Sequence, residues 1–567
     1  MRFLPLRPLR HPVPPGLRFV AAAAALALAA CGGGGGDDGA AATTAQAAAA
    51  PAEAPAGPLL VTGLSQTCSG CGAATSSTYA GGGVGTWGYP NTTGGDVDVQ
   101  YAITGVAGKT IALQLANLGA NGVALPTLSA SVMAERLSPQ SLSVESDEEA
   151  TQRAIREFNR KGWVDGTQAA SGAMKSTLAA PAPLAASLGT AGMTEGASRS
   201  WYHTDGTLRP ATLRRQVTTG DGTRVNIWVE TAESAAVTNN MVLELANTFA
   251  GPGLLYDRLV NVGGAVWGAN AFNGTLLPAG MPIDIVVLNF NHDNKPYGTV
   301  GYFWGVHNFL KAREARSNEA VSLYLDSETL SLGATGGMQS IKTTMAHEGT
   351  HMQNFYRRQV SMGSEFAYDA WLEEMTAMQM EDFLSGAIVS GYNPIGDVRL
   401  PDYYRYSDYN CNLLDFTGFG ATCESYAVSG SFGGFLNRQL GVAFFRDLLT
   451  RRTANSKQVL GEAISAARPG WTFDTAFVNW RATTNSSMPA ARTPDEYGYP
   501  AWTDGTFTLP ALDPSASKYT TLRKLPATAP AALLSLGSYI APRSDSNGVY
   551  SDKVRVPAGV TLSVVVY

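Results

Sequence analysis

The stretch TTMAHEGTHMQNF, residues 343–355, predicts a long helix with chemistry on one face. Met345 and Met352 lie along one apolar stripe of such a helix. His347 and His351 are four residues apart, so both imidazole rings lie beside that stripe and can bind a single ion together. The whole chain has only six histidines, and two of them lie on this turn. The stretch therefore predicts a metal-binding helix that packs against a protein core.

Glu348 supplies a general base on the same helix. It follows the first histidine and lies about 100° further round, where it reaches a water molecule on the ion without binding the ion itself. Zinc lowers the pKa of a bound water to about 7 and polarises a carbonyl group, and a carboxylate then carries the water's proton to the leaving amine. This HExxH arrangement predicts zinc-dependent hydrolysis of peptide bonds. The alternative is a chance match on a surface helix.

A catalytic zinc ion needs a third protein ligand, and its fourth position is left to water. The metzincin pattern would place glycine three residues and histidine six residues after the second histidine. Asn354 and Arg357 stand at those positions, which excludes that class. A glutamate from a following helix is the other common solution, and the helical pattern at 365–386 offers an acidic pair.

Within that pair, Glu374 is the better candidate for the third ligand. It shares a helix face with Ala370 and Ala377, whose small side chains leave room for an ion. Glu373 lies about 100° away on a more polar face, which indicates a solvent-directed side chain. We expect replacement of Glu374 to abolish zinc binding and activity, and replacement of Glu373 to leave both intact.

The sequence around these residues resembles that of the hyicolysin family of secreted neutral metalloproteases, a gluzincin group. The resemblance covers roughly residues 200–485 and implies a zinc endopeptidase with a thermolysin-like two-lobe fold. It implies His347, His351 and Glu374 as zinc ligands and Glu348 as the base. No motif indicates a structural calcium ion. The similar segments are AHEGTHMQNF (346–355), AWLEEMTAMQMED (370–382), GYFWGVHNF (301–309), SNEAVSLYLDS (317–327) and SGSFGGFLNRQLGVAFFRDLL (429–449).

The chain departs from the gluzincin pattern in two respects. Many members place an aspartate four residues after the ligand glutamate to orient a zinc histidine, whereas Met378 stands there in this sequence. Glu381 and Asp382 are the candidates to replace it. The donor that stabilises the transition state is not fixed by the pattern. Its candidates, each also compatible with a core or surface position, are Tyr426, Tyr302 and His307.

The N-terminus predicts a lipid-anchored protein of the cell envelope. Arginines precede the apolar run FVAAAAALALAA, which is too short for a permanent membrane span and is typical of a signal peptide, residues 1–30. The run ends in a sequence that resembles the bacterial lipobox, so we expect lipidation of Cys31; the alternative is an ordinary signal peptide. Residues 31–57 form a flexible tether. Glycine at position 32 favours the outer membrane of a Gram-negative bacterium, with an extracellular protein as the alternative.

The remaining four cysteines form two local pairs. Cys68 and Cys71 are separated by two residues, and Cys411 and Cys423 lie close together further along the chain. An exported protein sits where disulfides persist, so we predict two structural disulfides. Two alternatives for Cys68 and Cys71 are disfavoured. A zinc knuckle would need a second cysteine pair nearby, and none is present; a redox site would need a helix there, and no helical pattern follows.

On both sides of the region that resembles the protease family, runs of alternating apolar and polar residues predict β-strands. The predicted fold class is multidomain α+β, with the two-lobe catalytic domain flanked by small β-sandwich-like domains. The expected boundaries are 58–135 for an N-terminal β-domain, 136–199 for a helix and an Ala/Ser/Gly-rich linker, 200–485 for the catalytic domain and 486–567 for a C-terminal β-domain.

Other functions remain open at this point. The net charge of −6 without a basic block excludes a nucleic-acid binder, so the expected partners are protein or peptide substrates and the membrane. The main alternative to a protease is a non-catalytic surface adhesin on a protease-like scaffold. A third interpretation treats residues 58–199 as a removable propeptide.

Overall fold

The computed structural model describes most of the chain after residue 57. The predicted signal peptide, lipidation site and tether lie outside the described residues, as does much of the predicted linker. Within the described part, none of the helices combines the length and the apolar character that a membrane span requires. The described residues are 58–126, 146–165, 188–407, 410–418, 423–523, 525 and 529–567.

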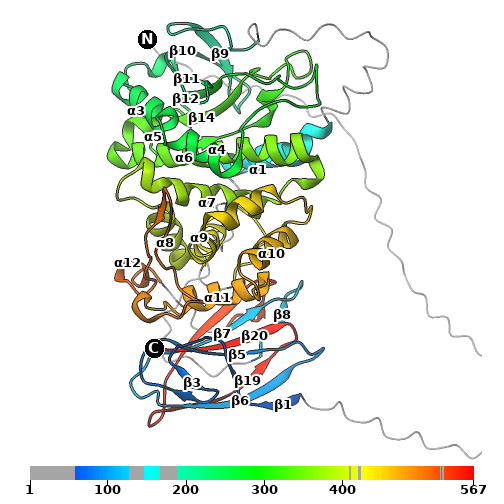
Figure 1. Cartoon of the computed structure of the whole chain (residues 1–567), viewed down its shortest axis with the longest axis vertical. Coiled ribbons are helices and arrows are strands. Elements are labelled where there is room, and N and C mark those ends of the chain that lie inside the picture. Colours follow the sequence, from blue (N-terminus) through cyan, green and yellow to red (C-terminus); the bar gives the residue numbers. More distant parts are fainter. Residues whose placement is uncertain are drawn as a thin grey trace, which may run out of the picture. The chain divides into compact units, whose positions relative to one another are not determined.

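A six-stranded mixed sheet forms the upper part of the molecule in Figure 1. Its order is β13-β14-β12-β11-β10-β9, and β11, β12 and β14 run parallel. These three strands are apolar almost throughout because both faces of the sheet are covered. The short strand β13 pairs antiparallel with β14 and forms the edge of the sheet. The bounds are β9 (Ser198–Tyr202), β10 (Leu208–Thr218), β11 (Arg224–Glu230), β12 (Ile283–Leu288), β13 (Gly301–Tyr302) and β14 (Val321–Asp326).

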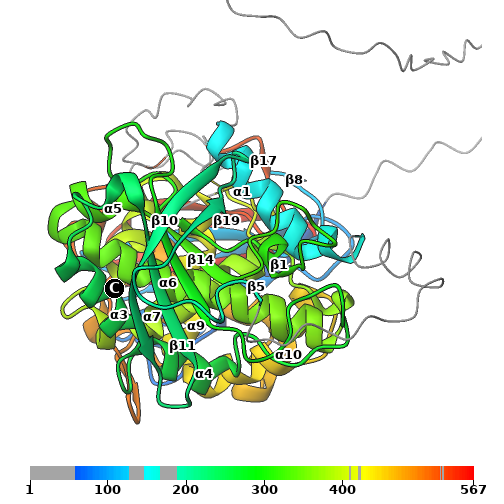
Figure 2. The same ribbon diagram turned by 90° about the horizontal axis from the view of Figure 1, so that it is seen from above.

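Helices cover one face of this sheet and continue away from it. Helices α3 and α6 pack against strands, and α4 and α5 pack on α6. Figure 2 shows the strands crossing over α6. Helix α7 returns along α6, and α9 packs on α7. The predicted helices over the metal-binding stretch and the acidic pair are thus confirmed. The bounds are α1 (Asp147–Glu157), α3 (Asn239–Ala250), α4 (Leu255–Gly263), α5 (Ser327–Leu332), α6 (Ala334–Asn354), α7 (Ala370–Ile388), α8 (Leu400–Asp402), α9 (Ser425–Thr450), α10 (Ser456–Ala467), α11 (Phe473–Asn485) and α12 (Ser517–Thr520).

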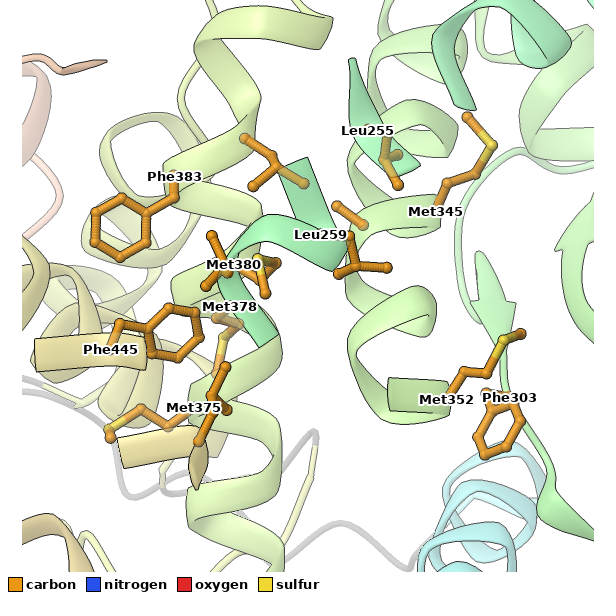
Figure 3. Close-up of a cluster of buried hydrophobic side chains, with 14 of the residues drawn as sticks. Leu255, Leu259, Phe303, Met345, Met352, Met375, Met378, Met380, Phe383 and Phe445 are labelled. Atoms are coloured by element: carbon orange, nitrogen blue, oxygen red, sulfur yellow. The ribbon is translucent and has the colours of Figure 1, made fainter. Parts of the chain in front are cut away.

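Methionine side chains fill the space between α6, α7 and their neighbours (Figure 3). Met345 and Met352 of α6 are fully buried, as are Met375, Met378 and Met380 of α7. Leucines of α4 and phenylalanines of α7 and α9 complete this cluster. Unbranched thioethers adapt to irregular gaps between packed helices. The residues of α6 that contact α7 are polar, as in the pairs His347–Glu374 and Asn354–Glu373, so the predicted apolar stripe of Met345 and Met352 lies on another face of α6.

The two terminal β-segments form a single sandwich. In one sheet β6 pairs with β19, so that Val97 lies opposite Val556. In the other sheet β7 lies between β18 and β20, and β20 also pairs with β5. Side chains from both sheets share one buried core. The bounds of its strands are β1 (Leu59–Thr62), β2 (Ser65–Gln66), β3 (Ala73–Thr75), β4 (Thr78–Tyr79), β5 (Gly85–Pro90), β6 (Val97–Thr104), β7 (Ile111–Asn117), β18 (Ser538–Arg543), β19 (Val549–Val556) and β20 (Val560–Val566). Two further strand pairs are β8 (Val123–Ala124) with β17 (Ala532–Leu533), and β15 (Trp502–Asp504) with β16 (Phe507–Leu509), which packs on α7 and α9.

This pairing corrects the expected division into two β-domains at 58–135 and 486–567. Each segment alone would leave long strands with unpaired edges, and each supplies the partner that the other lacks. The alternating patterns identified the strands correctly but carry no information about which distant run completes the sheet. The sandwich in turn packs against α11 through β7 and β20.

The two predicted disulfide pairs are present. The sulfur atoms of Cys68 and Cys71 lie at bonding distance, with their Cα atoms 5.9 Å apart. Those of Cys411 and Cys423 do as well, with Cα atoms 5.8 Å apart. The first pair closes a turn in the sandwich, and the second closes the loop before α9.

Candidate active site

The predicted metal-binding residues converge between α6 and α7. The chain leaves α6 through a π-helical turn, Phe355–Met362, and reverses at Gly363, whose φ of 137° suits glycine. One ligand atom from each of His347, His351 and Glu374 falls within 4.8 Å of the others. Oε2 of Glu374 lies 3.1 Å from Nε2 of His347 and 3.5 Å from Nε2 of His351. Both rings therefore turn the same nitrogen toward one carboxylate.

Each histidine is held on its other nitrogen by a further glutamate of α7. Nδ1 of His347 lies 2.5 Å from Oε1 of Glu381, and Nδ1 of His351 lies 3.0 Å from Oε1 of Glu373. A carboxylate on the far nitrogen fixes the ring's orientation and tautomer and leaves Nε2 to bind a metal. Glu381 is thus the residue that takes the place of the absent aspartate. Asp382, the other candidate, forms a buried ion pair with Arg438.

The solvent-directed position expected for Glu373 is wrong. Its side chain is only 20% exposed, and it accepts hydrogen bonds from Nδ2 of Asn354 as well as contacting His351. His351 and Asn354 are three residues apart on α6, so a carboxylate between the helices contacts both. The 100° offset between Glu373 and Glu374 predicts that Glu373 points to solvent. Because α7 lies close to α6, both side chains instead reach residues of α6. Asn354, one turn after His351, is the sequence signal that could have indicated a polar contact with Glu373.

Glu348 stands apart from the ligand cluster, against the edge of the sheet. It is buried, and β13 approaches α6 beside it. A Cβ at Gly301 would lie 2.6 Å from Thr344 and 3.4 Å from Cγ of Glu348, so glycine is needed for this close approach. Glu348 thus lies between the His347–His351–Glu374 cluster and the edge strand.

Comparison with known proteins agrees with this geometry. Residues 205–567, more than half of the chain, match the family model for Peptidase M30. The chain belongs to the peptidase M30 family. That family, the hyicolysin family, consists of zinc-dependent peptidases. Residues 66–130 match a domain of unknown function, DUF8571. No curated protein sequence matches the chain significantly.

The two matched regions of this M30 peptidase interlock in the structure. Strands β5, β6 and β7 lie in the domain of unknown function, whereas their partners β18, β19 and β20 lie within the peptidase match. The sandwich is therefore built from both regions and belongs to neither alone.

Electrostatics in the M30 site couple the histidines to the glutamates. Burial by itself would lower the pKa of His347, but hydrogen bonds with Glu374 and Glu381 outweigh burial and raise it to about 9. Burial would raise the pKa of Glu374, yet the nearby His351 and His347 hold it well below its usual range. A divalent cation that binds these ligands would displace protons from the imidazole rings.

The donor set fits zinc. Two imidazole nitrogens and one carboxylate oxygen, with the far nitrogens of both rings fixed by other groups, are the ligands of a catalytic site that keeps one position open. Glu348 remains outside this set. Burial is the main cause that raises its pKa, although His347 and His351 act in the opposite direction.

A cavity of about 270 Å³ opens onto these residues. Tyr426 lines it, and its hydroxyl donates to Oε1 of Glu374 at 3.4 Å. The other two candidates for the stabilising donor do not line this cavity. Tyr302 stacks on Tyr324 in a separate core, and His307 accepts a hydrogen bond from the backbone N–H of Asn318.

Two arginines near the zinc-binding cluster were not singled out from the sequence. Nη1 of Arg156 lies 3.8 Å from Oε1 of Glu374, and Nη2 of Arg399 lies 3.8 Å from Oε1 of Glu381. Both come from segments far from the HExxH stretch, so no local spacing could have revealed them.

Proposed function

We propose that this M30 peptidase is a zinc endopeptidase in which Glu348 is the general base. The observation that carries the proposal is the division of roles in one cavity. His347, His351 and Glu374 converge on one point, while the buried carboxylate of Glu348 lies beside them and outside the ligand set. An adhesin would have no need of a second buried carboxylate beside a complete ligand set.

The chain's own residues divide the work of proton transfer and positioning. A zinc ion, when bound, polarises the scissile carbonyl and acidifies a water molecule. Glu348 accepts the proton of that water and passes it to the nitrogen of the leaving amine. Its burial favours the protonated form, which suits a group that must hold a proton between two steps. Glu373 and Glu381 keep the two rings in place throughout.

The substrate proposed for this site is an extended protein segment. The edge strand β13 lies beside Glu348, and an exposed strand edge binds peptides through main-chain hydrogen bonds. We infer a thermolysin-like division into two lobes, with the sheet and α6 on one side of the cleft and α7 with α9 on the other.

Casein hydrolysis by the purified protein, with and without a chelator, tests this function. We expect about one zinc per chain and loss of cleavage on chelation, with recovery when zinc is restored. Glu348→Gln should keep zinc but lose turnover by about 10²–10⁴-fold, whereas Glu374→Ala should lose both. Glu365→Gln, a change at an exposed glutamate, serves as the control. Cleavage that survives complete removal of metal would overturn the proposal.

We also propose that the protein is held at a membrane through a lipid on Cys31, as the lipobox-like sequence suggests. Mass spectrometry of the mature N-terminus tests this directly. A diacylglyceryl group on Cys31 and recovery in the membrane fraction are expected, with Cys31→Ala abolishing both. An unmodified N-terminus at another residue would refute the anchor.

A further inference from the structure

A segment from outside the peptidase match lies in the active-site cavity. Helix α1 and the π-helical turn that follows it, Phe158–Gly162, precede the start of that match at residue 205. In Figure 1 this helix lies at the level of α6. Residues 146–165 are named here the cleft segment. It lines the cavity with Gln152, Ile155, Arg156, Glu157, Asn159 and Arg160.

One contact of the cleft segment reaches a zinc ligand. The guanidinium of Arg156 lies 3.8 Å from Glu374, and it also binds Glu149 at 2.6 Å. It rests over the ring of Phe416 at 5.1 Å. Arg156 is largely buried, so this group fills part of the cavity beside the metal-binding cluster instead of extending into solvent.

A second contact occupies the backbone that follows the edge strand. Oδ1 of Asn159 accepts the N–H of Gly305 at 2.7 Å, and its Nδ2 donates to the carbonyl of Phe303 at 3.0 Å. A side-chain amide has the same donor and acceptor as a peptide unit. An extended peptide that adds to a strand edge makes the same pair of hydrogen bonds. Glu148 similarly accepts the backbone N–H of Thr299, just before β13.

The end of the cleft segment is anchored in the protein core. Trp163 is buried and donates from Nε1 to Oε1 of Gln359 at 2.9 Å. Its ring packs edge-on against Phe272 and Phe355. The anchor fixes the segment where its polar side chains reach the cavity.

We propose that the cleft segment is an internal inhibitor, which occupies the substrate-binding cleft and keeps the intact chain latent until it is displaced. The proposal rests on the proposed peptidase function. It also limits what can be removed on activation. Strands β5, β6 and β7 pair with β18, β19 and β20, so the loss of all of residues 58–199 would take away half of the sandwich.

The test weakens the docking of the cleft segment in the full chain. The double variant Arg156→Ala/Asn159→Ala loses the contacts to Glu374 and to the strand edge but keeps the Trp163 anchor. We expect casein hydrolysis to rise at least about tenfold, a gain that corresponds to about 1.4 kcal/mol. Zinc content and thermal midpoint should stay close to wild type. Lys161→Ala, an exposed position on the same segment outside the cavity lining, is the matched control.

A binding measurement separates this inference from the peptidase function. The probe is a fluorescein-labelled peptide with the sequence of residues 146–165, added to zinc-loaded protein carrying Glu348→Gln. It should bind the double variant, whose cleft is vacated, at least tenfold more tightly than the wild-type background. A folded, zinc-loaded double variant that gains neither hydrolysis nor peptide binding would make the cleft segment a permanent wall and overturn the proposal. A gain in binding with no hydrolysis by any form would support the occlusion and refute the peptidase.

Discussion

Glu373 and Glu381 each contact the Nδ1 atom of one histidine of the HExxH motif. Glu373 has two partners on α6, the ring of His351 and the amide of Asn354. Removal of such a carboxylate leaves the ring free to rotate and typically lowers metal affinity by about 10–100-fold. We therefore expect Glu373→Ala to bind zinc more weakly by that factor, measured by competition with a chromogenic chelator.

The control for this prediction is Glu365→Gln, whose side chain is exposed. It should leave zinc affinity unchanged. An unchanged affinity in Glu373→Ala as well would restore the expectation from the sequence that this side chain is merely solvated.

Tyr426 is the one of the three candidate donors that lines the cavity. If its hydroxyl stabilises the developing oxyanion, Tyr426→Phe should lower kcat by about 10²-fold with little change in KM or zinc content. Tyr302→Phe is the matched change in the distant core and should leave kcat unaltered. Equal kcat values for Tyr426→Phe and the wild type would show that another group stabilises the transition state.

At the scale of the elements, His307 lies in a short 3-10 turn, Gly305–Asn308, and is buried against Tyr324 of β14. Burial, with Arg199 and His203 nearby, lowers the pKa of His307 from 6.5 to about 3. Between pH 6.5 and pH 3, His307 binds a proton in the unfolded state but not in the folded state. The free energy of unfolding is therefore highest above pH 6.5 and falls as the pH decreases toward 3. This histidine alone should cost about 1 kcal/mol between pH 6 and pH 5.

Urea unfolding at these two pH values checks this prediction. The loss of unfolding free energy between pH 6 and pH 5 should be smaller by about that amount in His307→Gln than in the wild type. The exposed His292 supplies the control, since His292→Gln should keep the wild-type pH dependence. Identical pH dependence in all three proteins would contradict the assigned cause.

The elements near the active site could be predicted because their patterns are local. Strands β11, β12 and β14, helices α6 and α7 and both disulfides follow from periodicity and spacing within short windows. The roles of Glu373 and Glu381 could not be predicted, because they depend on how α7 is rotated against α6. That rotation brings polar side chains of the two helices together, as in the contact of Asn354 with Glu373, and no spacing within either helix records it.

At the scale of the whole molecule, the fold depends on contacts between residues far apart in the sequence, which no local sequence pattern predicts. Arg156 reaches Glu374 from a helix that the sequence placed before a linker, and β6 finds β19 at the other end of the chain. The choice between Tyr426 and Tyr302 also depends on the tertiary fold, which buries Tyr302 in a separate core and leaves Tyr426 partly buried at the cavity.

The shared sandwich gives a prediction at this scale. Val564 of β20 lies opposite Trp87 of β5 and Leu113 of β7, and it is fully buried. Val564→Asp places a charge in the common core and should destabilise the sandwich by roughly 3 kcal/mol or more. Hydrogen exchange followed by mass spectrometry should then show faster exchange in residues 85–117, hundreds of positions away in sequence.

Ser551→Asp is the matched control, because Ser551 is exposed on β19. It should leave exchange in the N-terminal strands unchanged. Slow exchange there in the Val564→Asp protein would mean that the N-terminal strands form a stable sheet without their C-terminal partners.

The interlocked sandwich also constrains the order in which the chain is made. Asn91 in the first part of the sandwich donates to the carbonyl of Val556, a partner 465 residues later. At a synthesis rate of about 5–20 residues per second, the early strands wait roughly 20–90 s for that partner to leave the ribosome. During this interval β5, β6 and β7 present open strand edges, which are templates for pairing with other chains. A chain that stops before β18 lacks the partner strands of β5, β6 and β7, and we therefore expect it to be prone to aggregation.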